Sequence, residues 1–116
     1  MRFTLPFVLK NPLNGSVGHW SKRSKQRATD RLRCGMYILA AIGKETSGVG
    51  RRRVVIMLCR NPAHALDRDG AYASVKPLVD ALKDLGHLHN DTEEWLDLHV
   101  VQADSTVRQT EVEISD

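Results

Sequence analysis

One stretch, VVIMLC at residues 54–59, limits what this chain can fold into more than any other. Six consecutive apolar residues, half of them β-branched, are typical of a strand in the middle of a sheet that is buried on both faces. Three arginines precede the run, and a polar segment at residues 60–70, predicted to be a loop, follows it. The sequence therefore predicts a central strand around which a small sheet is built.

The segments before this strand have the periods of a strand and a helix. Alternating Phe and Leu side chains predict a strand over about residues 2–9, and the Pro-, Asn- and Gly-rich residues 11–18 predict a loop. Helical spacing over about 21–42 predicts a first helix. Its expected inner face consists of Ala28, Leu32, Gly35, Leu39 and Ile42.

The segments after the central strand predict a second helix and two further strands. The helix covers about residues 74–86, and Gly86 stands where a C-cap belongs. Pro77 marks its first turn or kinks it. Its expected buried face consists of Val75, Leu78, Val79, Leu82 and Leu85. Two alternating segments, about 95–103 and 106–114, flank a turn and predict a hairpin.

The resulting order, β-α-β-α-β-β, predicts an α+β fold with a single mixed sheet and both helices against it. With 116 residues the chain forms one domain, residues 1–116. A domain of this size buries only about 65% of the surface that its unfolded chain exposes. We therefore expect a small oligomer.

Charge divides the chain into two unlike parts. Residues 1–53 hold 12 basic and 2 acidic side chains, whereas residues 54–116 hold 5 basic and 12 acidic ones. This asymmetry predicts a basic surface for a polyanion, nucleic acid first, beside an acidic region that holds cations.

Nothing in the sequence predicts export or a membrane. The two cysteines lack the spacing of a disulfide framework or a zinc site. The first ten residues lack the apolar core of a signal peptide, and no run approaches the roughly 20 residues that cross a bilayer. We expect a cytoplasmic protein without a membrane partner.

The most specific local feature is Leu66-Asp67-Arg68-Asp69, between the central strand and the second helix. If the stretch is extended, the two carboxylates point to the same side. Mg²⁺ takes one or two carboxylates together with phosphate oxygens and water, so the pair is a candidate metal site. The alternative, compatible with the first, is that one of them is the N-cap of the second helix.

Other polar residues have simpler alternatives. Asp91 is a candidate ligand or a solvated acidic turn, and Lys76 is a candidate catalytic cation or a surface ion pair with Asp80. His87 and His89 alternate with Asp91 and are weaker metal-ligand candidates. A basic group beside Trp20 predicts phosphate contacts and base stacking, or else a solvated helix face. Its candidate DNA-binding members are Trp20, Lys22, Arg23, Lys25, Arg27 and Arg31.

The stretch LDRDGAYASVKPLVDALKDLGHLHNDTEEW, residues 66–95, resembles the RusA family of Holliday junction resolvases, many of them carried by prophages. It is similar to the family pattern of Asp-x-Asp-Asn, a lysine a few residues on, Asp-Ala-Leu, a glycine and then paired aspartates. The matching positions are Asp67, Asp69, Lys76, Asp80 and Asp91. The segment Pro12-Leu13-Asn14, followed by Trp20 and basic residues, is similar to the family's amino-terminal loop, though less specifically.

The resemblance implies a RusA-like homodimer in a bacterial or phage-infected cell, acting in DNA recombination and repair. It implies a Mg²⁺-dependent endonuclease, with Mn²⁺ able to substitute, that nicks two opposing strands of a four-way DNA junction. By the same resemblance Asp67, Asp69 and Asp91 would bind the metal and serve catalysis. Lys76 would be an essential basic residue, and Asn14 would join the DNA contacts.

The sequence departs from the family pattern at two places. Gly70 replaces the usual Asn, and Asn90 replaces the first acid of the later pair. These departures favour an alternative, a non-catalytic branched-DNA-binding protein of the same fold. A weaker third reading is an interaction protein whose acidic half docks a basic partner.

Geometry restricts how Asp91 can reach the other two acids. A helix over 74–86 is roughly 18–20 Å long, and five extended residues span only about 17 Å. Either residues 87–91 run straight back beside the second helix, or Asp91 completes the site of another subunit.

Overall fold

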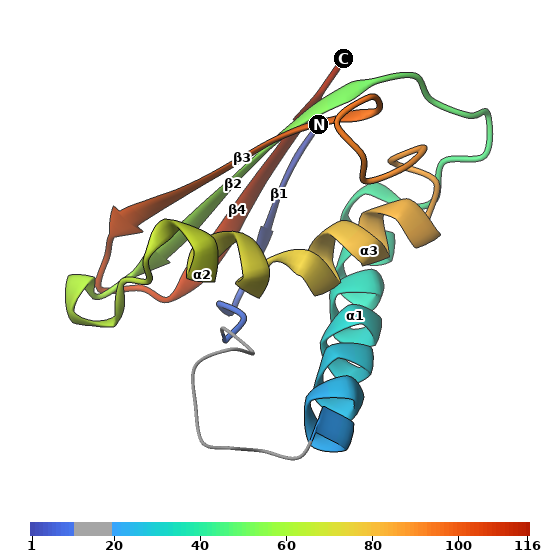
Figure 1. Cartoon of the computed structure of the whole chain (residues 1–116). Coiled ribbons are helices and arrows are strands. Elements are labelled where there is room, and N and C mark those ends of the chain that lie inside the picture. The colour runs from blue at the N-terminus through green and yellow to red at the C-terminus, as the bar shows by residue number, and fades with distance from the viewer. Residues whose placement is uncertain (11–19) are drawn as a thin grey trace.

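The structure, a computed structural model of the chain, describes residues 1–10 and 20–116, and for residues 20–23 the backbone alone. The chain forms a four-stranded sheet, and Figure 1 shows the helices against it. The elements in chain order are β1 (Arg2–Leu5), α1 (Trp20–Ile42), β2 (Arg52–Arg60), a 3₁₀ turn η1 (Pro62–His64), α2 (Arg68–Ser74), α3 (Lys76–Asp84), β3 (Leu96–Asp104) and β4 (Gln109–Ser115). The predicted α+β class with a mixed sheet is confirmed.

The strands lie in the order β1-β4-β2-β3. β3 pairs in parallel with β2 along its whole length, from Arg52 opposite Leu96 to Arg60 opposite Asp104. β4 is antiparallel to both β2 and β1. The predicted hairpin of the last two strands is therefore wrong, because β2 lies between β3 and β4. Two alternating segments joined by a short turn look the same whether they pair with each other or with a third strand.

The hydrophobic core lies on one face of the sheet. Val54, Ile56 and Leu58 of β2 are buried, and Val112 and Ile114 of β4 continue the same layer. The helices cover this face (Figure 1). The prediction that β2 is buried on both faces is wrong for most of the strand, since Val55 and Met57 point to the other face of the sheet and are only partly buried. Cys59, on the same face as these two, is buried.

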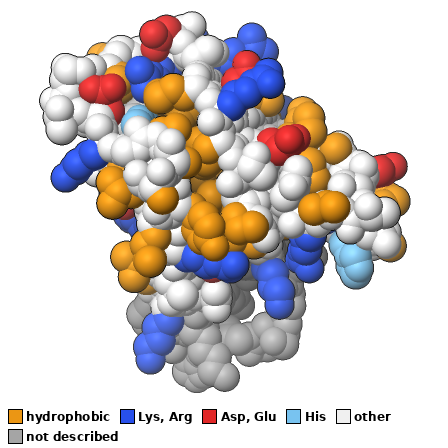
Figure 2. All heavy atoms as spheres, turned by 180° about the vertical axis from the view of Figure 1, so that it is seen from behind, with side chains coloured by type: hydrophobic (Ala, Val, Ile, Leu, Met, Phe, Trp, Pro, Cys, Tyr) orange, Lys and Arg blue, Asp and Glu red, His pale blue; other side chains and the backbone are white. Residues whose placement is uncertain are grey.

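Helix α1 begins and ends within a residue of its predicted bounds. Its predicted inner face is wrong at Leu32, which is 69% exposed, and at Leu39, which is exposed as well, whereas Ile42 packs against the core as predicted. Cys34 and Ile38 are fully buried in their place. α1 packs mainly against α3, with fewer contacts to β1, so the core receives only a narrow stripe of its surface. Figure 2 shows hydrophobic side chains that reach the surface among charged ones.

The predicted second helix is two helices. α2 ends at Ser74 and α3 begins at Lys76, with Pro77 in the first turn of α3, so the first-turn alternative for Pro77 is confirmed. The predicted buried face is confirmed at Val75, Leu78, Val79 and Leu82. The predicted loop over 60–70 is too long, because η1 and the start of α2 fall within it.

No helix in the described part of the chain is long and apolar enough to cross a membrane.

Gly86 ends α3, as its position in the sequence predicts. The amide of Gly86 donates to Lys83 O (3.1 Å) and the amide of His87 donates to Leu82 O (2.9 Å), the two bonds of a Schellman motif. Gly86 has φ +82°, and a Cβ built there would lie 2.0 Å from Glu45 O. The amide of Glu45 in turn donates to Leu85 O (2.9 Å). The glycine thus allows the segment after α1 to lie directly on the end of α3.

We expect Gly86→Ala to lower the free energy of unfolding by roughly 2–4 kcal/mol, because left-handed backbone strain and overlap with a backbone oxygen add. Gly48 is the matched control, since it has φ +80° and open space around its Cβ position. Gly48→Ala should cost only about 1 kcal/mol. Urea denaturation of both variants measures the difference, and equal losses would show that the contact with Glu45 does not hold α3.

Candidate functional site

The first two candidate acids lie at the start of α2. Asp67 is its N-cap: Oδ1 accepts a hydrogen bond from the amide of Gly70 (2.8 Å). The N-cap alternative is therefore confirmed for Asp67. Asp69 is in the first turn of α2 and is exposed. Because residues 68–74 are helical, the extended geometry that would direct both carboxylates to one side is wrong.

Strand β3 holds this segment in place. The side-chain amide of Gln102 accepts from the backbone of Leu66 (2.8 Å) and donates to its carbonyl oxygen (2.7 Å). One helical turn further on, Tyr72 Oη contacts the edge of β3 at Leu98 O and at the amide of Val100, both at 3.3 Å. The backbone that carries Asp67 is thus fixed to the sheet at two points.

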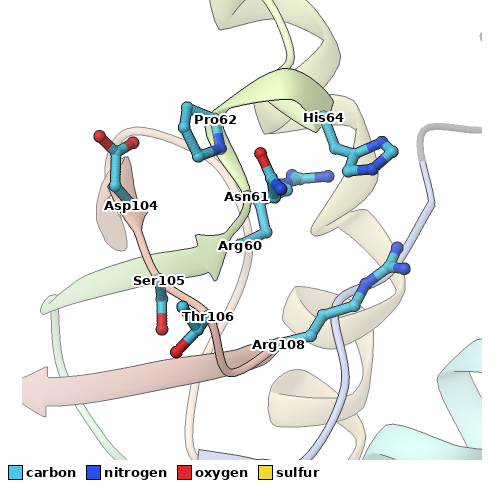
Figure 3. A pocket seen from close by; sticks show the side chains of 8 residues that line it. All are labelled: Arg60, Asn61, Pro62, His64, Asp104, Ser105, Thr106 and Arg108. Atoms are coloured by element: carbon cyan, nitrogen blue, oxygen red, sulfur yellow. The ribbon is translucent and has the colours of Figure 1, made fainter.

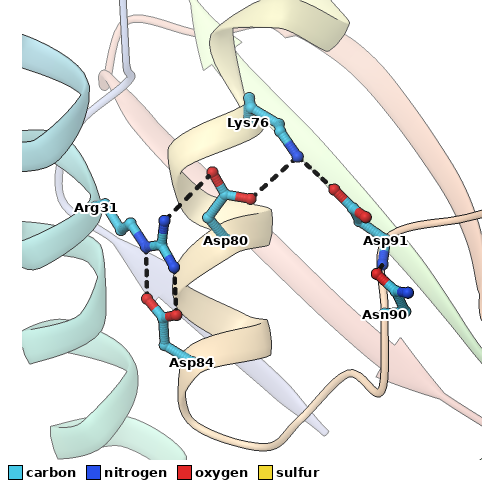
Figure 4. A network of polar contacts seen from close by, with 6 residues as sticks. All are labelled: Arg31, Lys76, Asp80, Asp84, Asn90 and Asp91. Atoms are coloured by element: carbon cyan, nitrogen blue, oxygen red, sulfur yellow. Dashed lines mark hydrogen bonds and ion pairs between the residues drawn. The ribbon is translucent and has the colours of Figure 1, made fainter. Parts of the chain in front are cut away.

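Lys76, Asp80 and Asp91 form one network, shown in Figure 4. Lys76 Nζ donates to Asp91 Oδ2 and lies 3.0 Å from Asp80 Oδ1. The hydrogen bond to Asp91 raises the pKa of Lys76, and the same bond lowers the pKa of Asp91. The predicted ion pair between Lys76 and Asp80 is confirmed, with Asp91 as a further partner of Lys76.

The path of the chain after α3 answers the geometric question posed by Asp91. α3 ends at Asp84, and its first residue, Lys76, binds Asp91. Residues 87–91 therefore run back beside α3 within the same chain.

The three candidate carboxylates do not converge on one point. Among residues 1–10 and 20–116, no three His, Cys, Asp or Glu side chains form a group that could hold a metal ion. The carboxylate oxygens of Asp67 and Asp69 suit Mg²⁺, which is commonly bound by two carboxylates together with water and phosphate oxygens. Asp91 as a third ligand stays a prediction.

The histidines before Asp91 have other partners. His87 is buried, and its Nε2 lies 2.7 Å from Gly43 O. His89 is exposed, and its ring centroid lies 4.1 Å from that of Trp95. Within the described part of the chain, both histidines and Asp91 do not form a group that could hold a metal ion, so the weaker hypothesis of a metal site there gains no support.

The predicted DNA contacts fall on α1 and on the loop before it. Asn14 lies outside the described residues, as do the side chains of Trp20, Lys22 and Arg23. Lys25 and Arg27 are exposed. Figure 1 shows the amino-terminal part of α1, which carries Lys25 and Arg27, extending away from the sheet.

Arg31 differs from the other basic residues because it joins α1 to α3. Its Nε donates to Asp84 Oδ2 (2.6 Å), Nη2 donates to Asp84 Oδ1, and Nη1 lies 4.0 Å from Asp80 Oδ2 (Figure 4). A phosphate bound by Arg31 would compete with these carboxylates.

Sequence reasoning missed Arg60, the last residue of β2. The predicted polar loop includes this residue, yet Arg60 is only 6% exposed. The signal in the sequence is the alternation of side chains along a strand. Val54, Ile56 and Leu58 point into the core, and a period of two brings the side chain at position 60 to the same face.

Comparisons with known proteins do not assign the chain to a family: no family model matches it, and no curated protein matches it. The likeness of residues 66–95 to the RusA pattern therefore depends on those residues alone.

The pairing of Arg31 with Asp84 predicts a specific pH dependence. Hydrogen bonding to Arg31 is the largest cause that lowers the pKa of Asp84 from its ordinary 3.8. The folded pKa is below the unfolded one, so the stabilisation is fully present above about pH 4 and is lost as pH falls through the folded pKa. Because both side chains are nearly half exposed, its size is below about 1 kcal/mol.

We expect Asp84→Asn to lower the free energy of unfolding at pH 6 and to have little effect at pH 2. The same substitution in an Arg31→Gln background is the control, and it should be nearly silent at both pH values. Denaturant titrations at each pH complete this double-mutant cycle. A loss of equal size with and without Arg31 would contradict the assignment.

Proposed function

We propose that this chain is a metal-dependent endonuclease that acts on branched DNA, with the four-way junction as its substrate and Mg²⁺, or Mn²⁺ in its place, as its cofactor. The observation that carries the proposal is the return of Asp91 to the start of α3, where it binds Lys76. It places Lys76 and Asp91 together directly after α2, whose first turn carries Asp69. The resemblance of residues 66–95 to the RusA pattern supports the same function.

The chain's own groups would divide the work. Asp67 and Asp69 offer carboxylate oxygens for the metal, and the bond from Gly70 to Asp67 fixes the orientation of that carboxyl group. When bound, the metal activates water and neutralises charge on the phosphate. Lys76, the first residue of α3, would supply a positive charge. A fixed positive charge stabilises a phosphoryl group during its transfer.

Exposed side chains of α1 support the proposed partners. Lys25 and Arg27 offer positive charge to DNA phosphates. Leu32, Met36 and Leu39 are exposed along α1 at helical spacing, and a second copy of this chain in a homodimer would cover such a surface.

A second candidate function is a branched-DNA-binding protein of the same fold without catalysis. It is favoured by the separation of the acids, since no three ligands converge within the described residues. Incubation with a labelled four-way junction at high protein concentration, in Mg²⁺ and in Mn²⁺, separates the two. A pure binding protein shifts the junction in a gel and leaves it uncut in both metals.

We expect Asp69→Asn to reduce the rate of junction cleavage by about 100-fold or more, equivalent to about 2.7 kcal/mol, while junction binding persists. A chelator should likewise stop cleavage and spare binding. Cleavage is measured as paired nicks in opposing strands on a denaturing gel.

Asp97→Asn is the matched control, because it removes the same charge from β3, where Asp97 pairs with Arg53 and His99. It should cut like the parent. If Asp69→Asn also cuts like the parent, the proposed metal site is wrong.

A further inference from the structure

The carboxyl end of β2 carries a buried arginine for which no described residue is a partner. Arg60 continues the inward row of β2 and is 6% exposed. Its Nε and Nη2 are buried and have no hydrogen-bond partner among the described residues. Buried charges in proteins are ordinarily paired and hydrogen-bonded, because an unpaired one loses its hydration without compensation. Arg60 therefore requires a partner that the described residues do not supply.

A cleft opens beside this arginine, shown in Figure 3. It has a volume of about 600 Å³ and lies between the end of β2, η1 and the turn between β3 and β4. Arg60, Arg108 and His64 line it, together with Ser105 and Thr106. Ligand sites have volumes of roughly 300–1,000 Å³, so the cleft accommodates a phosphate together with the sugar to which it is attached.

The charge in the cleft is mainly positive. Burial is the largest cause that lowers the pKa of Arg60, and the charge of Arg108 lowers it further. A guanidinium nevertheless stays protonated in proteins, so two like charges face the same space. Asp104 is the carboxylate of the lining, and Figure 3 shows it directed away from both arginines. No carboxylate of the described residues forms an ion pair with Arg60 or Arg108.

The cleft lies at the carboxyl ends of two parallel strands. β2 and β3 are parallel, and Arg60 lies opposite Asp104 at their carboxyl ends. In open α/β sheets, ligands bind outside the carboxyl ends of the parallel strands, and β2 and β3 form the parallel pair of this sheet. The cleft lining does not include Asp67, Asp69, Lys76 or Asp91, so it is separate from the candidate metal site.

We infer that this cleft, which we call the Arg60 cleft, binds a phosphate group through the guanidinium groups of Arg60 and Arg108. Planar guanidinium groups donate paired hydrogen bonds to phosphate oxygens, and a ring N–H of His64 can donate a further one. The phosphate comes from a free nucleotide or phosphate ion, or from the backbone of DNA. The DNA source rests on the proposed function, whereas the site itself does not.

The site is tested first with inorganic phosphate. In a buffer without phosphate, Arg60→Met should have a melting temperature no lower than that of the parent, because it removes an unpaired buried charge and keeps the apolar stem. Phosphate should raise the melting temperature of the parent saturably, beyond chloride at equal ionic strength.

Calorimetric titration should give a phosphate Kd at least about tenfold weaker for Arg60→Met, the loss expected for hydrogen bonds to a charged group. The exposed Arg108→Gln should weaken binding less, by about threefold. Arg51→Gln is the control, because it removes the same charge beside the opposite end of β2. The Arg51 side chain donates to Glu93 O (3.3 Å), and the variant should bind phosphate like the parent. An equal response of Arg60→Met and the parent to phosphate, or no response of the parent beyond chloride, would overturn the inference.

A DNA titration distinguishes the two sources of phosphate. If the Arg60 cleft takes a backbone phosphate, Arg60→Met weakens junction binding and lowers the slope of log K against log salt by about 1. If it takes a free phosphate, junction binding is unchanged while phosphate binding is lost. Phosphate binding without any junction cleavage would leave the Arg60 cleft in place and remove only the proposed endonuclease activity.

Discussion

The alternation of side chains along β2 is the constraint on which the rest of the structure depends. Val54, Ile56 and Leu58 fill the core from the middle of the sheet, and β3 and β4 bind the two edges of the same strand. Because side chains alternate between the two faces of a strand, the face of one residue fixes the face of every other residue. Arg60 therefore enters the interior as the last member of the row, and the same pattern that forms the core also forms the Arg60 cleft.

Local signals in the sequence predicted the parts of the fold that depend on neighbours along the chain. The helical spacing of Val75, Leu78, Val79 and Leu82 identified the buried face of α3, because those residues face one side wherever the helix packs. Gly86 was identified as a helix end because a left-handed residue there favours glycine. The cap formed by Asp67 belongs to the same class of short-range interaction.

Features that depend on distant segments were not predictable from one sequence. The pairing of β4 with β1 is formed by the two ends of the chain, and the segments that became β3 and β4 had the pattern of a hairpin. The inner face of α1 was misassigned because Leu32 and Leu39 are as apolar as buried residues, and only the packing of α1 on α3 shows that Cys34 and Ile38 face inward. The contact of Asp91 with Lys76 depends on the path of residues 85–91, for which no periodic pattern exists.

Both candidate sites include residues at the carboxyl end of β2 or on the connection that follows it. Arg60 ends the strand, Asp67 begins α2, and Gln102 of β3 fixes the backbone of Leu66 just before that cap. The separation of the two sites is thus set by the sheet, which gives more precise positions than a free loop. The two sites carry opposite charges and therefore act differently on a phosphate. The arginines attract a phosphate without a bound cation, whereas the carboxylates repel it unless a cation is bound. The proposed phosphate site and the proposed metal site therefore depend on different side chains, Arg60 and Arg108 in one and Asp67 and Asp69 in the other.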